Sequence, residues 1–234
     1  MEEYSYNTNS KTKCWYKNIC DKSKCGDEFC IRHYKMDCLT HMACMDGNLK
    51  YPIQLMLDSD GTDREAYGKL KSIQNTIYDF VTSGQNLLIY SLNTGNGKTE
   101  WCKKLLLSWF DSIWHTTDFE CRGIFVSMPR FMQAMKENIN SPNEYYQYIN
   151  DNILKADVVV WDEINYKDLT DFEHSYLLGI ISQRILTGKS NIYTTNYDLD
   201  SIVKKLGTRL ASRIVGSSIK VEFKGKDKRN WRVD

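Results

Sequence analysis

The sequence lacks the features of a membrane, secreted or uniformly basic nucleic-acid-binding protein. No apolar run approaches the roughly 20 residues that a transmembrane helix needs. The first residues, MEEYSYNTNSK, are acidic and polar, whereas a signal peptide is basic and then apolar. The 31 basic and 30 acidic side chains almost cancel, which excludes a globally basic chain. We therefore expect a cytoplasmic protein without a membrane partner.

Length and cysteine distribution indicate one substantial domain with a small appendage. The chain has 234 residues, of which 41% are hydrophobic, enough for one large core. Six of its eight cysteines lie between residues 14 and 44, and a turn-rich stretch, DGNLKYPIQLMLDSDGTD, follows them. We predict a metal-held domain at residues 1–50, a linker at 51–69 and the main domain at 70–234.

The cysteine cluster predicts a zinc site. An intracellular chain keeps its thiols reduced, so closely spaced cysteines indicate metal binding rather than disulfides. Zinc takes four thiolate or imidazole ligands. Cys14, Cys20, Cys25 and Cys30 are the preferred set because they lie in the turn-rich part, whereas IRHYKMDCLTHMACM has a helical pattern. His33 is the leading substitute, and free, buried cysteines are the alternative interpretation.

Five short apolar runs alternate with helical patterns in the rest of the chain. They are NLLIYS (86–91), GIFVSM (123–128), DVVVWD (157–162), NIYTTN (191–196) and IKVEF (219–223). Strands that alternate with helices pair in parallel and are covered on both faces. Ahead of them, the segment REAYGKLKSIQNTIYDFVTSG (64–84) has apolar residues at helical spacing between positions 70 and 81 and ends in Gly84, which predicts one amphipathic helix. We therefore predict an α/β fold with a five-stranded parallel sheet.

The first predicted strand leads into a loop with two glycines and then into a helical segment, in SLNTGNGKTE. Gly95 and Gly97 leave room for a phosphate to approach main-chain N–H groups, and the helix N-terminus adds further donors. Lys98 would reach phosphate oxygens, and the Thr99 hydroxyl would bind Mg²⁺. The full phosphate-loop pattern has a glycine where this chain has Leu92. The predicted ATP-binding residues are Asn93, Thr94, Gly95, Asn96, Gly97, Lys98, Thr99 and Glu100.

Two acidic residues follow the third predicted strand, in ADVVVWDEIN. Ligands of open α/β sheets bind at the carboxyl ends of the strands. Asp162 is therefore predicted to hold Mg²⁺ through water, and Glu163 to orient or deprotonate the attacking water. Asn196, at the end of NIYTTN, would lie beside the γ-phosphate if its strand neighbours the first one. Spacing alone leaves open whether Asn196 acts there or only turns the chain.

Together these motifs resemble the AAA+ P-loop ATPases, and within them the DnaC-like replicative helicase loaders of bacteria and phages. The resemblance spans nearly all of residues 70–234, through NLLIYSLNTGNGKTEW, VVVWDEI, SNIYTTNYD and LGTRLASRIVGSSIKVEFKGKDKRNW. It carries an arginine finger onto Arg213, with Arg209 one helical turn away on the same face. Surface solubility is the alternative role of these arginines. Few residues follow DKRNWR, so we expect no C-terminal lid domain.

The resemblance also implies a function. It implies an ATPase that self-associates on ATP, binds a hexameric replicative helicase and assists its placement on single-stranded DNA. The cysteine-rich segment is similar to the metal-binding, helicase-contacting domain of such loaders. Two alternatives use the same core: a transposition helper ATPase that assembles on duplex DNA, and an adaptor that binds ATP without hydrolysing it.

Two basic segments are candidates for contacting DNA. Single strands are held by basic side chains along the phosphates and by aromatic faces for the bases. The segment MPRFMQAMKENINSPNEYYQYIN lies where DnaC-like loaders carry an inserted helix, and it offers Arg130, Phe131 and Lys136. The helical spacing of Phe131, Met132 and Met135 equally fits core packing. The second segment is the basic tail, with Lys224, Lys226, Lys228 and Arg229.

Overall fold

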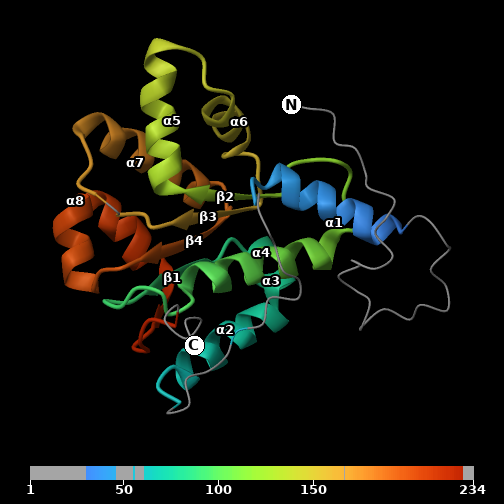
Figure 1. Cartoon of the computed structure of the whole chain (residues 1–234), viewed down its shortest axis with the longest axis horizontal. Helices are drawn as coiled ribbons and strands as arrows, with labels where there is room; N and C mark the ends of the chain where they lie inside the picture. The colour runs from blue at the N-terminus through green and yellow to red at the C-terminus, as the bar shows by residue number, and fades with distance from the viewer. Residues whose placement is uncertain (1–29, 46–54, 56–60, 166, 229–234) are drawn as a thin grey trace, which may run out of the picture.

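A computed structural model describes residues 30–45, 55, 61–165 and 167–228 (Figure 1). The helices in this part are α1 (Ile31–Met42), α2 (Arg64–Asn75), α3 (Ile77–Thr82), α4 (Lys98–Ile113), α5 (Met128–Asn140), α6 (Glu144–Asn152), α7 (Asp171–Leu186) and α8 (Leu199–Gly216). The strands are β1 (Asn86–Tyr90), β2 (Gly123–Ser127), β3 (Val158–Asp162), β4 (Ser190–Thr195) and β5 (Ser218–Glu222). Each predicted strand is present, with both ends within one residue of the prediction. None of these helices is long and apolar enough to cross a membrane.

The strands form one five-stranded sheet in the order β2-β3-β4-β1-β5. Every neighbouring pair is parallel, as predicted. β4 lies between β1 and β3, and Tyr90 at the end of β1 is paired with Thr195 at the end of β4. The carboxyl ends of β1, β4 and β3 therefore lie side by side at the same end of the sheet.

Alternation along the strands divides the core into two layers. In β1, Leu87 and Ile89 join the hydrophobic cluster formed with α1 to α4, whereas Leu88 joins the cluster formed with α5 to α8. Successive side chains of a strand point to opposite faces, which produces this division. Figure 1 shows the corresponding arrangement, with α1 to α4 on one side of the sheet and α5 to α8 on the other. Strands β1 to β4 are thus buried on both faces, whereas the edge strand β5 exposes Ile219, Lys220 and Glu222.

Helix α1 packs against the sheet-containing core. Its buried side chains Met36 and Leu39 belong to the same hydrophobic cluster as α4. The N–H of Phe125, in β2, also donates a hydrogen bond to the oxygen of Ala43, just after α1, at 2.8 Å. The predicted division at residue 50 stays a prediction, because residues 1–29, 46–54 and 56–60 lie outside the described part.

The single helix predicted within residues 64–84 is two helices in the structure. α2 begins at Arg64, within the predicted linker, and ends at Asn75, and α3 begins at Ile77. Thr76, between them, has φ −115° and ψ 30°, and its hydroxyl donates to the oxygen of Ser72 at 3.1 Å. Such threonine bonds to the preceding turn compete with helix geometry. The apolar stripe stays buried across the break.

A buried arginine binds main-chain oxygens just before β3 and at the start of β4. Arg184, on α7, is fully buried and donates to the oxygens of Ala156 and Ser190 at 2.9 and 2.6 Å. It also donates to the Asn191 side chain at 2.8 Å and to the oxygen of Ile153. Burial lowers the pKa of Arg184 to about 10, which leaves it charged at neutral pH.

Candidate nucleotide site

The loop between β1 and α4 has the backbone that its glycines predict. Gly95 has φ 66° and Gly97 has φ 101°, a left-handed region that side chains disfavour. Gly97 is the N-cap of α4, so the helix begins at Lys98. Leu92, at the departure from the full pattern, is 70% exposed and precedes the tight part of the loop. Helix α4 therefore begins directly after two glycines, which bring no side chains of their own into the loop.

The side chain of Lys98 is buried inside this loop. Its Nζ donates to the main-chain oxygen of Asn93 at 2.7 Å and to Oδ1 of Asn96 at 3.1 Å. Asn96 is fully buried, and its Nδ2 donates to the Ser91 hydroxyl at 2.8 Å. The N–H of Asn93 donates to the same hydroxyl at 3.0 Å. Ser91, which the sequence did not single out, thus shapes the loop that carries the lysine.

Thr99 and Asp162 meet across the sheet edge, as predicted for two residues of a magnesium site. The Thr99 hydroxyl donates to Oδ1 and Oδ2 of Asp162 at 3.0 and 3.2 Å. A second hydroxyl, that of Thr194 in β4, donates to Oδ1 of Asp162 at 2.7 Å. Burial raises the pKa of Asp162, and the two hydroxyl bonds oppose that rise. A hydroxyl beside an oxygen-donor carboxylate fits the hard ligands that Mg²⁺ prefers.

Glu163 and Asn196 follow the ends of adjacent strands. Glu163 has φ 59°, which is rare for a residue with a side chain, and its N–H donates to the Thr194 hydroxyl at 2.8 Å. Unusual backbone of this kind is common at functional sites. Asn196 comes directly after β4. The strand β4 is the neighbour of β1, which is the arrangement that would place Asn196 beside the γ-phosphate. Thr194, which no sequence pattern singled out, contacts both acidic residues: its hydroxyl donates to Asp162 and accepts from the N–H of Glu163.

Comparison with known proteins agrees with this geometry at the level of the fold. No family model and no curated protein matches the sequence. The crystal structure of the DnaC helicase loader matches with a TM-score of 0.58 and 18% identity, over 74% of this chain and 94% of that one. The crystal structure of DnaI matches with a TM-score of 0.57 and 17% identity, over 74% of this chain and 88% of that one. The structure of the replication initiator DnaA, bound to AMPPCP and single-stranded DNA, matches with a TM-score of 0.52 and 20% identity. The match covers 69% of this chain and 46% of that one.

The fold of the chain is therefore similar to that of the DnaC helicase loader and of DnaI. In this fold the two predicted finger residues lie on α8. Gly207, with φ 70° and ψ 156°, breaks α8, and Arg209 and Arg213 lie on its second half. Both side chains are exposed, and Nη1 of Arg213 donates to the oxygen of Arg209 at 3.1 Å. A side chain of α7 contacts the main chain at this break: Nε2 of His174 lies 2.9 Å from the main-chain oxygen of Leu206.

The predicted DNA-contacting segment forms α5 and α6, between β2 and β3. Phe131 is fully buried and stacks on Tyr146, with ring centroids 5.6 Å apart. The core interpretation is therefore correct for Phe131, which has no exposed face for a base. Arg130 is exposed, with its guanidinium 4.0 Å from the centroid of the Tyr145 ring, and Lys136 is 61% exposed.

The described residues give no support for zinc. Among residues 30–45, 55, 61–165 and 167–228, no group of three or more His, Cys, Asp or Glu side chains could hold a metal ion. Cys14, Cys20 and Cys25 lie outside these residues. Cys30 is the N-cap of α1, and His33 is buried on that helix. The zinc ligand set therefore stays a prediction.

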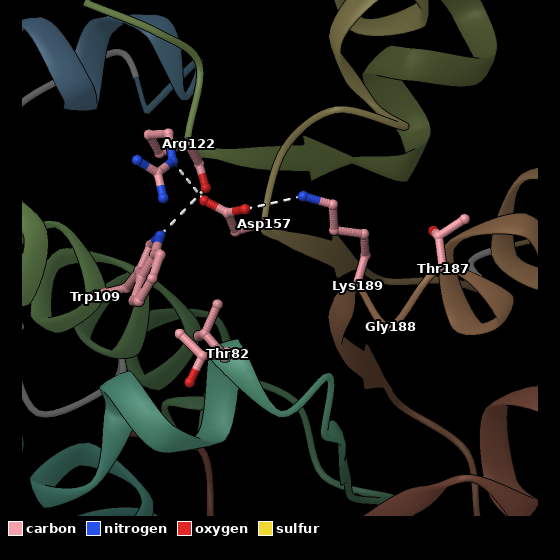
Figure 2. Close-up of a pocket in the computed structure, with 8 residues that line it drawn as sticks. Thr82, Trp109, Arg122, Asp157, Thr187, Gly188 and Lys189 are labelled. Carbon is pink, nitrogen blue, oxygen red and sulfur yellow. Dashed lines mark hydrogen bonds and ion pairs between the residues drawn. The ribbon is translucent and has the colours of Figure 1, made fainter. Parts of the chain in front are cut away.

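A polar cavity of about 240 Å³ lies at the opposite end of the sheet, where the strands begin (Figure 2). Asp157 there pairs with Nε of Arg122 at 2.5 Å and with Nζ of Lys189 at 2.9 Å. These three residues directly precede β3, β2 and β4, so the cavity opens at the amino ends of the strands. Nucleotides bind at the carboxyl ends, which makes this cavity distinct from the candidate site.

Proposed function

We propose that the protein is an ATP-dependent loader of a replicative helicase. The observation that carries the proposal is the contact of Thr99 with Asp162 beside a loop that buries Lys98. A fold like that of the DnaC loader, over 94% of that chain, supports a role in helicase loading.

Each residue of the site has a distinct proposed part in ATP binding and hydrolysis. The main-chain N–H groups of the loop and Lys98 would hold the phosphates, and Thr99 with Asp162 would hold Mg²⁺. Mg²⁺ supplies charge neutralisation at the phosphates. Glu163 would orient or deprotonate the attacking water, and Asn196 would position it.

Assembly and DNA contact extend the proposal beyond one chain. Arg213 would reach the ATP of a neighbouring copy, where its charge stabilises the transferred phosphoryl group. Self-association on ATP would follow.

Arg130 and Lys136 are the proposed contacts for single-stranded DNA, since both are exposed on α5. Arg130→Ala with Lys136→Ala should then weaken DNA binding and flatten its salt dependence, with ATP affinity unchanged.

The deciding experiment uses the full chain, the hexameric replicative helicase of the same cell, and circular single-stranded DNA. With ATP, the protein should co-purify with the helicase and increase the helicase retained on the circles, which offer no free end. The Lys98→Ala variant should lose the ATP-dependent part of this effect. Absence of both a helicase complex and ATP-dependent retention would refute the proposal.

A further inference from the structure

The segment that follows β5, residues 224–228, lies along the phosphate loop. Nδ2 of Asn93 donates to the oxygens of Lys224 and Gly225, each at 3.1 Å. The N–H of Lys228 donates to the oxygen of Gly95 at 3.0 Å. The contacts run across the loop from its first residues to its first glycine. We call residues 224–228 the strap.

One side chain of the strap, that of Asp227, lies directly against the loop. A Cβ atom added to Gly95 would lie 1.8 Å from Oδ1 and 2.5 Å from Oδ2 of Asp227. Thr94, the preceding residue, directs its hydroxyl to Oδ2 of Asp227 at 3.5 Å. A carboxylate therefore occupies the space that the missing side chain of Gly95 leaves open. Gly95 is one of the two glycines predicted to leave room for a phosphate, so Asp227 lies beside the proposed phosphate site.

The strap is also anchored from the side of α2. Asp63 is the N-cap of α2 but does not cap it; its carboxylate instead accepts hydrogen bonds from the N–H groups of Lys224 and Gly225, the shortest at 2.8 and 3.1 Å. Asp63 is 1% exposed, so these bonds are shielded from water. Nζ of Lys228 donates to the Tyr67 hydroxyl at 3.1 Å. An N-cap carboxylate turned away from its own helix indicates that holding the strap is its role.

We propose that the strap is an autoinhibitory element that competes with the phosphates of a nucleotide for the loop. The inference rests on the proposed ATP binding. Asp227 places a negative charge where a polyphosphate would add more, and like charges at this range repel. The strap must therefore leave the loop when nucleotide binds, and removing the charge of Asp227 must favour the nucleotide.

The charge is tested with the Asp227→Asn variant of the full chain. Its affinity for a fluorescent ATP analogue should rise about fivefold or more, the scale of one partly screened charge pair. The matched control is Asp118→Asn, which removes the same charge from an exposed position beyond the C-terminal end of α4, away from the loop and the strap. The control should bind like the wild type. Equal affinity of Asp227→Asn and the wild type would overturn the inference while leaving ATP binding intact.

The movement is tested by limited digestion with trypsin, because the strap contains Lys224, Lys226 and Lys228. A non-hydrolysable ATP analogue should accelerate cleavage within the strap of the wild type, but not of Lys98→Ala. Cleavage that nucleotide leaves unchanged or slows would overturn the inference. If neither the wild type nor Asp227→Asn binds nucleotide while both remain folded, the proposed function fails together with the strap.

Discussion

The Thr99 hydroxyl, in the first turn of α4, donates to both carboxylate oxygens of Asp162, 63 positions later in the chain. The bond joins the loop that would hold phosphates to the strand end that would hold the metal ion. Because Thr194 donates to the same carboxylate, the position of Asp162 is fixed from two elements. The site is therefore organised by the protein itself, which reduces the ordering that a bound ligand must impose.

The first prediction concerns magnesium. Thr99→Val keeps the shape of the side chain but removes its oxygen, so ATP should bind with little difference between buffers with Mg²⁺ and with EDTA. The wild type should bind ATP more tightly with Mg²⁺. Thr82→Val, on the exposed side of α3, is the control and should keep the Mg²⁺ effect. A full Mg²⁺ effect in Thr99→Val would show that this hydroxyl holds no metal ion.

The second prediction separates binding from hydrolysis. Lys98→Ala should lose ATP affinity, because it removes the cation of the phosphate loop. Glu163→Gln should bind ATP near normally but turn it over roughly a hundredfold more slowly, as expected when a general base is removed. Equilibrium binding and single-turnover hydrolysis measure the two effects. Equal loss of ATP binding in both variants would contradict the division of roles.

The third prediction concerns Arg213. Arg213→Ala should bind ATP normally as a single chain and lose stimulated turnover, because the arginine acts on a neighbouring copy. Mixing it with Lys98→Ala protein should restore part of the activity through a mixed interface. Lys204→Ala, exposed on the first half of α8, should behave as the wild type. No recovery over a range of mixing ratios would argue against assembly through this face.

The fourth prediction concerns stability. Arg184→Lys keeps the charge but cannot reach all the oxygens that the guanidinium bonds, and it leaves buried carbonyls unsatisfied. The free energy of unfolding in urea should fall by roughly 2 to 4 kcal/mol. Arg209→Lys, on an exposed position, should change it by less than about 0.5 kcal/mol. A similar small change in Arg184→Lys would mean that the network contributes little.

The fifth prediction concerns the cysteine-rich segment. If Cys14, Cys20, Cys25 and Cys30 bind zinc, purified protein should contain about one zinc ion per chain. Chelation should then abolish helicase binding and leave ATP binding in place, because a small metal domain owes its folding to the ion. Elemental analysis that finds no metal in freshly purified protein would remove the zinc domain.

The strands could be predicted from the sequence because each is a short apolar run bounded by turn residues. The loop at Gly95 and Gly97 could be predicted because its backbone requires glycine, a requirement visible in the sequence. The hydroxyl of Thr194 could not, since a threonine in a strand is commonplace and only the order of the strands brings it to Asp162. The place of Asp227 depends on a tertiary contact with no local signal. Phe131 had the spacing of a core residue, and packing decided its role.

The position of β4 also constrains how the site arises during synthesis. Its strand lies between those that precede Lys98 and Glu163, yet it is made after both. Until residues 190–195 have left the ribosome, the ends of β1 and β3 have no shared neighbour to hold them together. Thr194 arrives with that strand and secures Asp162. A growing chain should therefore be unable to bind ATP until about four fifths of its residues have left the ribosome, and premature termination before β4 should yield an inactive fragment.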